Sequence, residues 1–209
     1  MSRMLWLMAI LSSGLSLAIV DNRLDAAEPR KHLATFDDQK RPGDWGVNCG
    51  HWEPEAGVLV VRELKSDEHA AASRWRIPMQ DGVVRLRAKF AGGKAFHVGF
   101  DPQPGTLKKQ GHLYSLVVTP ESAQIKKHRD KSDAKSKDET LATGSFAPPA
   151  DGWFPLELRT EGDRVQVTIG NATKLEATDP TFHVAKPTVV FRVMGGDVHF
   201  DDVEVTVAK

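Results

Sequence analysis

The alternation of apolar and polar residues along this chain constrains its fold more than any other feature. In residues 84–90, apolar side chains occupy every second position and charged side chains occupy the positions between them. The same alternation returns in residues 156–159 and 165–169. Successive side chains of a strand point to opposite faces, so this pattern predicts antiparallel strands with one buried and one solvated face.

Glycine-containing pairs separate the alternating segments. Asp81–Gly82, Gly92–Gly93 and Gly195–Gly196 predict turns. Many short strands with frequent turns indicate an all-β sandwich or barrel. Further strands are expected at residues 33–36, 58–63, 71–77, 83–90, 95–100, 113–119, 123–127, 174–177, 188–193 and 198–207.

The apolar phase reverses within the last expected strand. Val198 and Phe200 occupy even positions, whereas Val203 and Val205 occupy odd positions. A shift of one residue moves every later side chain to the opposite face of a sheet. The reversal therefore predicts a β-bulge, or a strand that changes face, at Asp201–Asp202.

One segment does not fit a packed core. Residues 126–140 (KKHRDKSDAKSKDET) hold six Lys or Arg, four Asp or Glu, and Ala134 as the one apolar side chain. This composition cannot bury enough surface to offset its ordering entropy. The mixed charges favour a flexible, solvated hairpin tip over a binding site for an acidic polymer.

The first residues have the pattern of a secretory signal. Arg3 precedes a short apolar stretch, which polar residues and the small pair Ala26–Ala27 follow. Residues 1–27 are therefore expected to be a signal peptide, and residues 28–209 the β-sandwich domain. The apolar stretch is too short and interrupted for a comfortable membrane span, although an uncleaved anchor is the alternative. We expect export to the periplasm or the extracellular space, with no stable membrane insertion after cleavage.

Whole-chain charge and cysteine content exclude several classes of partner and cross-link. The formal net charge is zero, so nothing electrostatic favours binding to nucleic acid or to an anionic membrane. Cys49 is the single cysteine, which rules out an intrachain disulfide. No tight histidine spacing typical of a metal site occurs, and neither a metal nor another cofactor is expected.

Several short motifs carry a resemblance to a known family. They are residues 34–38 (ATFDD), 43–45 (GDW), 50–53 (GHWE), 57–61 (GVLVV), 151–158 (DGWFPLEL) and 198–205 (VHFDDVEV). The chain resembles a concanavalin A-like jelly-roll domain family that was long of unknown function and is now associated with 3-keto-disaccharide hydrolases. The resemblance implies a two-sheet antiparallel jelly-roll sandwich, an exported location and a carbohydrate or glycoconjugate as partner.

The chain differs from the enzymatic branch of that family at two places. An Asn-Ser-Gly turn followed by arginine is replaced by residues 95–99 (AFHVG), and a Trp-Asn pair by Trp153–Phe154. Glycosidases on this fold place paired acids on alternate positions of one strand, and no E-x-D-x-E occurs here. A hydrolase with two catalytic acids is therefore disfavoured.

Two groups of residues remain as a candidate site. His97 alternates with the apolar positions of its strand and points to the wet face, where Asp101 and Tyr114 are expected to line a sugar groove with it. In the second group, Glu68 would orient His69 if both lie in a loop, and Arg74 would donate paired hydrogen bonds to a carboxylated sugar or keto oxygen. The candidate catalytic residues are His69, His97 and Asp101, and the candidate substrate-binding residues are Glu68, Arg74 and Tyr114.

Three functions follow from these patterns. The first is an exported carbohydrate-associated domain that binds a glycan in a shallow groove, which needs no catalytic constellation. The second is a glycoside-active enzyme resembling 3-keto-disaccharide hydrolases. The third is a structural protein of the cell envelope.

Overall fold

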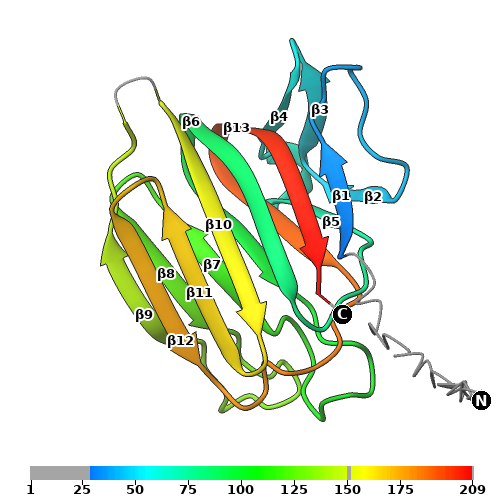
Figure 1. Ribbon diagram of the computed structural model, residues 1–209, viewed down its shortest axis with the longest axis vertical. Coiled ribbons are helices and arrows are strands. Elements are labelled where there is room, and N and C mark those ends of the chain that lie inside the picture. Colours follow the sequence, from blue (N-terminus) through cyan, green and yellow to red (C-terminus); the bar gives the residue numbers. More distant parts are fainter. Residues whose placement is uncertain (1–28, 150–151, 209) are drawn as a thin grey trace, which may run out of the picture.

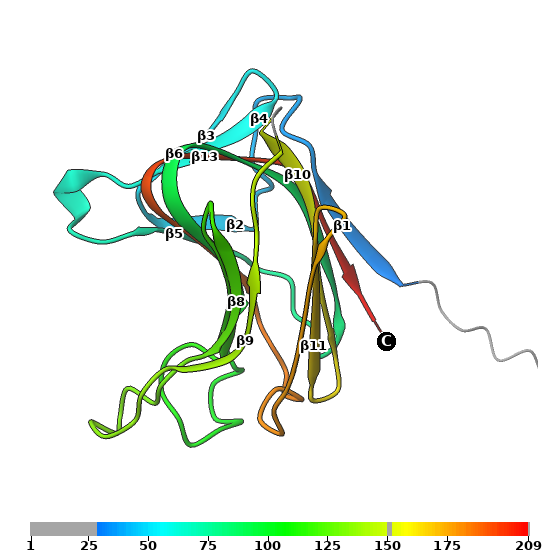
Figure 2. The ribbon, with the colours of Figure 1, turned by 90° about the vertical axis from the view of Figure 1, so that its left-hand side faces the viewer.

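The computed structural model describes residues 29–149 and 152–208, which form one 13-stranded antiparallel β-sheet that folds into a two-layer sandwich (Figures 1 and 2). Its two layers are called the back sheet and the front sheet. The expected signal peptide, residues 1–27, lies outside the described residues and stays a prediction. Within the described part of the chain, no helix is long and apolar enough to cross a membrane. The all-β prediction is confirmed.

Two long strands connect the sheets. β6 (Gly82–Phe100) and β13 (Val189–Val207) each contain 19 residues and pair with each other along nearly their whole length. Both bend midway, so one half of each strand belongs to each sheet (Figures 1 and 2).

The back sheet surrounds the N-terminal half of β6 and the C-terminal half of β13. β10 (Trp153–Glu161), β11 (Arg164–Ile169) and β12 (Thr173–Thr178) continue it on one side. On the other side, β13 pairs with β1 (Arg30–Ala34) and with β4 (Val58–Arg62), which pairs with β3 (His51–Glu55).

The front sheet surrounds the other halves of the two long strands. β7 (Tyr114–Val118) pairs with β6, and β8 (Ser122–Lys127) and β9 (Glu139–Ser145) follow. β5 (Ala71–Trp75) pairs with β13 and with β2 (Trp45–Cys49). A short 3₁₀ helix, η1 (Lys65–Asp67), precedes β5.

Aromatic side chains fill the space between the sheets. Phe96 packs edge-on against Phe200 across the sandwich, with ring centroids 5.4 Å apart. Trp45, Trp52 and Trp75 are buried in the same core, where large aromatic rings fill the space between the layers.

Two of the glycine pairs predicted as turns, Gly92–Gly93 and Gly195–Gly196, are instead bends within continuous strands. Gly92 and Gly195 have φ values of 107° and 81°, a region that side chains rarely occupy, and the register between β6 and β13 shifts beside them. The strands expected at 83–90 and 95–100 are therefore one strand, as are those at 188–193 and 198–207. A local glycine signal does not distinguish a reversal of the chain from a bend across a sandwich.

Other local predictions have mixed outcomes. The predicted bulge is confirmed, because Asp202 has a φ of 49° and the pairing of β13 with β6 shifts between Asp201 and Glu204. The loop predicted at 126–140 is shorter, since β8 continues to Lys127 and β9 begins at Glu139. These two strands pair, so residues 128–138 form a hairpin tip.

We expect Gly93→Ala to lower the free energy of unfolding by about 1–3 kcal/mol, because overpacking of a close contact costs this much. A Cβ on Gly93 would lie 2.4 Å from Val198 Cγ2 and 3.0 Å from the carbonyl oxygen of Asp197. Gly43→Ala is the matched control, since no atom lies within 4 Å of its added Cβ. Urea denaturation measures both, and equal stabilities would contradict the close packing at the bend.

Candidate functional site

The outer face of the front sheet gathers the polar residues of the candidate site. His97 on β6 lies opposite Arg192 on β13 and Val117 on β7. Because side chains alternate along a strand, Ala95 and Gly99 share the outer face with His97, whereas Phe96, Val98 and Phe100 belong to the core. His97 was predicted to point away from the core, and this register places its side chain on the outer face of the sheet.

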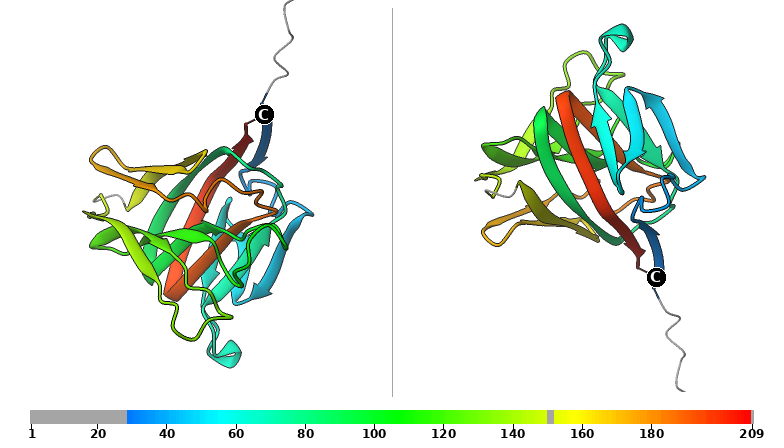
Figure 3. Two further views of the ribbon diagram at one scale, coloured as in Figure 1. Left: turned by 90° about the horizontal axis from the view of Figure 1, so that it is seen from below. Right: turned by 90° about the horizontal axis from the view of Figure 1, so that it is seen from above.

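A groove of about 460 Å³ lies on this face. Figures 2 and 3 show two projections on the same side of the front sheet, namely the segment around η1 and the hairpin tip 128–138. The groove has a volume typical of small-ligand sites, which span roughly 300–1,000 Å³. Its lining residues are His69, Ala95, His97, His112, Val117, Lys126, His128, Arg129, Lys131, Asp138, Arg192 and Met194.

Small residues lie beneath the polar side chains of this face. Ala72 and Ala95 are buried, and Gly99 lies opposite Ser115 of β7. A Cβ on Gly99 would lie 2.4 Å from Ser115 Oγ and 2.5 Å from the carbonyl oxygen of Tyr114. The glycine therefore allows the Ser115 side chain to lie over the sheet.

His97 and Arg192 carry buried polar atoms without partners. Within the described residues, neither His97 Nδ1 nor Arg192 Nε makes a hydrogen bond. Burial, together with the positive charge of Arg192, lowers the pKa of His97 to about 3. His97 is therefore neutral at physiological pH, and both side chains offer hydrogen-bonding capacity that a ligand would satisfy.

An Asp–His–Arg cluster lies at one end of this face. Asp101 accepts a hydrogen bond of 3.0 Å from Arg74 Nε and one of 2.5 Å from His112 Nδ1. Arg74 also donates to Asn48 Oδ1. Burial alone would raise the pKa of Asp101, but the His112 and Arg74 hydrogen bonds outweigh it and hold this pKa below its usual value. The carboxylate is thus ionised and orients the His112 imidazole.

His128 connects this cluster to the hairpin tip. Its Nε2 lies 2.8 Å from Ser115 Oγ, and its ring lies edge-on to His112 with centroids 5.5 Å apart. Asp138 lies 3.6 Å from His128 Nδ1. Burial lowers the pKa of His128 to about 4 despite the nearby Asp138 carboxylate, so this imidazole is also neutral at physiological pH.

The structure brings together some of the predicted site residues. His69 and His97 both line the groove, and Arg74 pairs with Asp101 on the same face. Glu68 and His69 lie in the loop between η1 and β5, as their pairing required. However, His69 Nδ1 donates to the carbonyl oxygen of Ala70 at 2.7 Å, so no hydrogen bond from Glu68 orients it in the described structure.

Tyr114 does not belong to the groove. Its side chain is fully buried in the core, where its ring lies 4.3 Å from that of Phe182 between centroids. Burial raises the pKa of its phenol. The prediction that Tyr114 binds substrate is wrong because it placed this residue on the outer face, whereas the register places Ser115 and Val117 there.

Sequence reasoning did not select Arg192, His112, His128 or Lys126 for the site. Arg192 lies between Phe191 and Val193, which are buried, so the alternation along the strand predicts that Arg192 points to the outer face. The sequence does not predict that Arg192 lies opposite His97, because this pairing joins residues nearly a hundred positions apart. His128 and Lys126 belong to the charged segment that composition assigned to a solvated tip.

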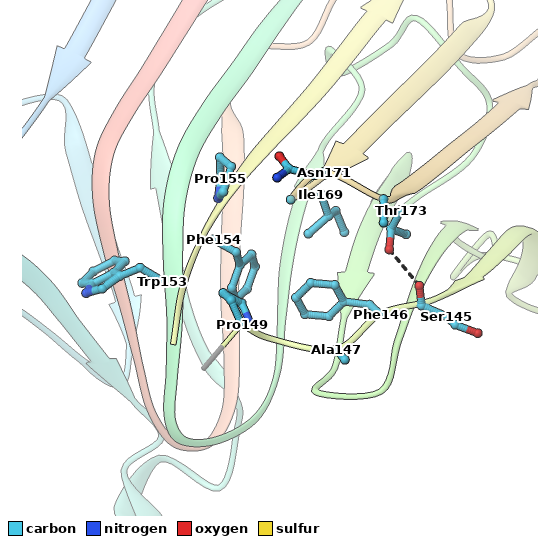
Figure 4. A pocket seen from close by; sticks show the side chains of 12 residues that line it. Ser145, Phe146, Ala147, Pro149, Trp153, Phe154, Pro155, Ile169, Asn171 and Thr173 are labelled. Carbon is cyan, nitrogen blue, oxygen red and sulfur yellow. Dashed lines mark hydrogen bonds between the residues drawn. The ribbon is translucent and has the colours of Figure 1, made fainter. Parts of the chain in front are cut away.

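A second cavity, of about 530 Å³, opens at the end of the sandwich between β9, β10 and the β11–β12 hairpin (Figure 4). Phe146, Phe154 and Ile169 form much of its wall, and Thr173 Oγ1 donates to the carbonyl oxygen of Ser145 at 2.8 Å. Its described lining contains no titratable side chain, so it offers no acid–base chemistry. In the described ranges, no three His, Cys, Asp or Glu residues gather in a way that would hold a metal ion.

Comparisons with known proteins show the fold. No protein-family model matches the chain, and no curated protein sequence matches it at a significant level. Among solved structures, the carbohydrate-binding module CBM66 from Bacillus subtilis has a TM-score of 0.60 at 16% identity, covering 77% of this chain and 94% of that one. A non-specific endo-β-1,3(4)-glucanase from family GH16 has a TM-score of 0.63 at 14% identity, covering 87% and 96%.

A further structural neighbour is LamA from Z. galactanivorans in complex with laminaritriose and laminaritetraose. Its TM-score is 0.58 at 13% identity, and the match covers 84% of this chain and 97% of that chain. The chain thus has the concanavalin A-like jelly-roll fold that its motifs implied. Fold likeness at such identity does not assign the chain to a specific family, and membership of the 3-keto-disaccharide hydrolase family stays a prediction.

We expect the free energy of unfolding to fall by on the order of 4 kcal/mol between pH 7 and pH 5, about 2 kcal/mol from each of two histidines. His97 and His128 have native pKa values of about 3 and about 4, below the ordinary value of 6.5. Between these values the unfolded chain binds protons that the native chain does not, so stability decreases as the pH falls below 6.5. Denaturant titrations at several pH values measure this slope.

The double variant His97→Gln/His128→Gln should have a shallower slope over the same pH range. His183→Gln is the control, because His183 is exposed. A wild-type slope in the double variant would contradict the assignment of these two histidines as buried and neutral.

Proposed function

We propose that this protein is an exported, carbohydrate-associated jelly-roll domain that binds a glycan in the groove on the outer face of the front sheet. The observation that carries the proposal is the pair of unpartnered polar atoms, His97 Nδ1 and Arg192 Nε, at a groove lined by further polar side chains. A buried donor or acceptor without a partner costs about 1–3 kcal/mol. A ligand rich in hydroxyl groups would recover this cost once small side-chain rotations expose these two atoms, which are covered in the structure.

The structural neighbours support the same class of ligand. One is described as a carbohydrate-binding module, one was co-crystallised with 1,3-β-D-cellotriosyl-glucose, and one is in complex with laminarin oligosaccharides. These ligands belong to those proteins. They support a glycan here because the same scaffold presents an open sheet face, while the residues on that face differ from chain to chain.

Hydrogen bonding dominates the recognition that this groove offers. Among its described lining residues, the only aromatic rings are imidazoles, and Trp45, Trp52 and Trp75 lie in the core instead. Stacking of a sugar on a large aromatic ring is therefore not the basis of the proposed binding. The proposal places hydroxyl groups against His97, His112 and His128, whose rings both accept and donate hydrogen bonds.

The export part of the proposal rests on residues 1–27, which combine Arg3, an apolar stretch and Ala26–Ala27. Periplasmic or extracellular glycans would be the accessible ligands. Expression of the full chain with a C-terminal tag, followed by fractionation and mass determination, tests it. A processed chain outside the cytoplasm is expected, and a full-length cytoplasmic chain would contradict it.

A panel of neutral and acidic oligosaccharides screened against the purified protein should identify at least one bound glycan. His97→Gln and Arg192→Gln are each expected to weaken that binding by about tenfold or more, because each removes a directed hydrogen-bonding group. Isothermal titration calorimetry measures the affinities.

Arg87→Gln is the matched control for the groove variants. Arg87 lies on the back sheet, 5.0 Å above the Trp153 ring, and pairs with Asp201 and Asp202. Its substitution should leave glycan affinity unchanged. Absence of binding across the whole panel would overturn the proposed function and favour the structural role in the cell envelope.

A second candidate function is glycoside-directed catalysis, and the Asp101–His112 pair favours it. An ionised carboxylate fixes one imidazole nitrogen of His112, which leaves the other available to take a proton from a substrate. The catalytic prediction for Asp101 thus has a partner in His112 that the sequence did not indicate. His69 and His97 would then contact the substrate rather than form the proton-transferring pair.

Incubation with 3-keto-disaccharides and with unmodified disaccharides tests this candidate. Should turnover occur, His112→Gln is expected to reduce kcat by about 100-fold or more, the usual contribution of a general base. His183→Gln, which changes an exposed histidine outside the groove, should leave kcat unchanged. Turnover that survives His112→Gln would exclude this pair as the catalytic base.

A further inference from the structure

Positive charge gathers at the groove although the whole chain has no net charge. Lys126, Arg129, Lys131 and Arg192 line it, and Asp138 is the one carboxylate among its described lining residues. Elsewhere on the described sheets, most arginines pair with carboxylates, as Arg85 does with Glu157 and Glu204. The groove therefore attracts anions more strongly than a chain of zero net charge would suggest.

Arg192 differs from most arginines on the described strands. Those side chains each pair with an aspartate or glutamate, whereas Arg192 forms no ion pair within the described residues and its Nε is buried without a hydrogen bond. The paired arginines are Arg62, Arg74, Arg85, Arg87, Arg159 and Arg164. A half-buried guanidinium at the groove thus lacks the anion that its counterparts have.

Guanidinium geometry indicates which anion fits. Two parallel N–H groups of an arginine match the two oxygens of a carboxylate, a planar fit that a single ammonium group does not offer. His97 lies opposite Arg192 in the sheet and stays neutral because its pKa is about 3. A neutral imidazole beside the guanidinium offers a hydrogen bond to a hydroxyl group instead of a second fixed charge.

We propose that the groove recognises a uronic-acid-containing glycan, with the sugar carboxylate on Arg192 and a neighbouring hydroxyl group on His97. This inference rests on the proposed glycan-binding function and names the substrate class for the same groove. Arg74, predicted from the sequence to bind a carboxylated sugar, already pairs with Asp101. Arg192 takes that role.

The cations around Arg192 have a second, long-range effect. Arg129 and Lys131 are exposed on the hairpin tip, and Lys126 precedes it at the end of β8. Exposed charges accelerate the approach of an anionic ligand and are screened by salt, because the Debye length is about 8 Å at physiological ionic strength. Binding of a uronate should therefore weaken as salt increases, and binding of a neutral sugar should not.

The test uses oligosaccharides of galacturonate, mannuronate, guluronate and glucuronate, each compared with its carboxyl methyl ester. The ester keeps the sugar ring and removes the charge. Calorimetry with the purified protein should show that at least one free acid binds about tenfold or more tightly than its ester. A sulfated oligosaccharide is included, and its binding more tightly than every uronate would overturn the carboxylate assignment.

Variants separate the guanidinium from the general charge. Arg192→Lys keeps the charge and loses the paired N–H groups, so it should lose most of the preference for acid over ester, and Arg192→Gln should lose all of it. Lys126→Gln should lower only the salt-sensitive part of the affinity. Thermal denaturation checks that each variant is folded, and Arg87→Gln is the control for a distant arginine.

The outcomes distinguish the two proposals. Equal affinity for acid and ester, with loss of both in His97→Gln, would overturn the uronate inference and leave glycan binding in place. An acid preference that survives Arg192→Gln would also overturn the inference. Failure of every acidic and neutral sugar to bind would overturn the proposed function itself.

Discussion

The backbone pairing between β6 and β13 is the interaction on which the rest of the structure depends. Both strands run through both sheets, and every other described strand joins this pair directly or through a neighbour. The pairing therefore holds the sandwich together by main-chain hydrogen bonds as well as by the aromatic core. It is possible only because glycines at Gly92–Gly93 and Gly195–Gly196 allow both strands to bend at the same level.

The groove is a consequence of that pairing. Where β6 and β13 cross into the front sheet, their register places His97 opposite Arg192, and the neighbouring strands contribute Ser115 and Lys126 to the same outer face. Alternation assigns the intervening residues to the core. The chemistry of the face is then set by burial: low pKa values keep His97 and His128 neutral, while Asp101 stays ionised between Arg74 and His112.

The same framework accounts for how much of the site could be predicted. His97 was predictable, because its orientation follows from a local period of two. Asp101 was predictable as a residue at the end of that strand, but its partner His112 lies beyond a loop whose course composition does not specify. Tyr114 was misplaced although its face was predictable: it shares the phase of Leu116 and Val118, and a period of two assigns all three side chains to the core. The likeness to carbohydrate-active proteins establishes the fold that carries these residues, and their function has to be tested by experiment.

Alternation, turn residues and the phase reversal at Asp201–Asp202 were sufficient for the all-β class, most strand positions and the bulge, because each depends on neighbours in the chain. The sequence did not predict β2, β3 and β9, because these strands lack a long alternation of apolar and polar residues. The continuity of β6 and β13, the partner of each strand and the meeting of His97 with Arg192 depended on the tertiary structure. They are contacts between residues far apart in sequence, and a local pattern specifies which face a side chain occupies but not which strand lies beside it.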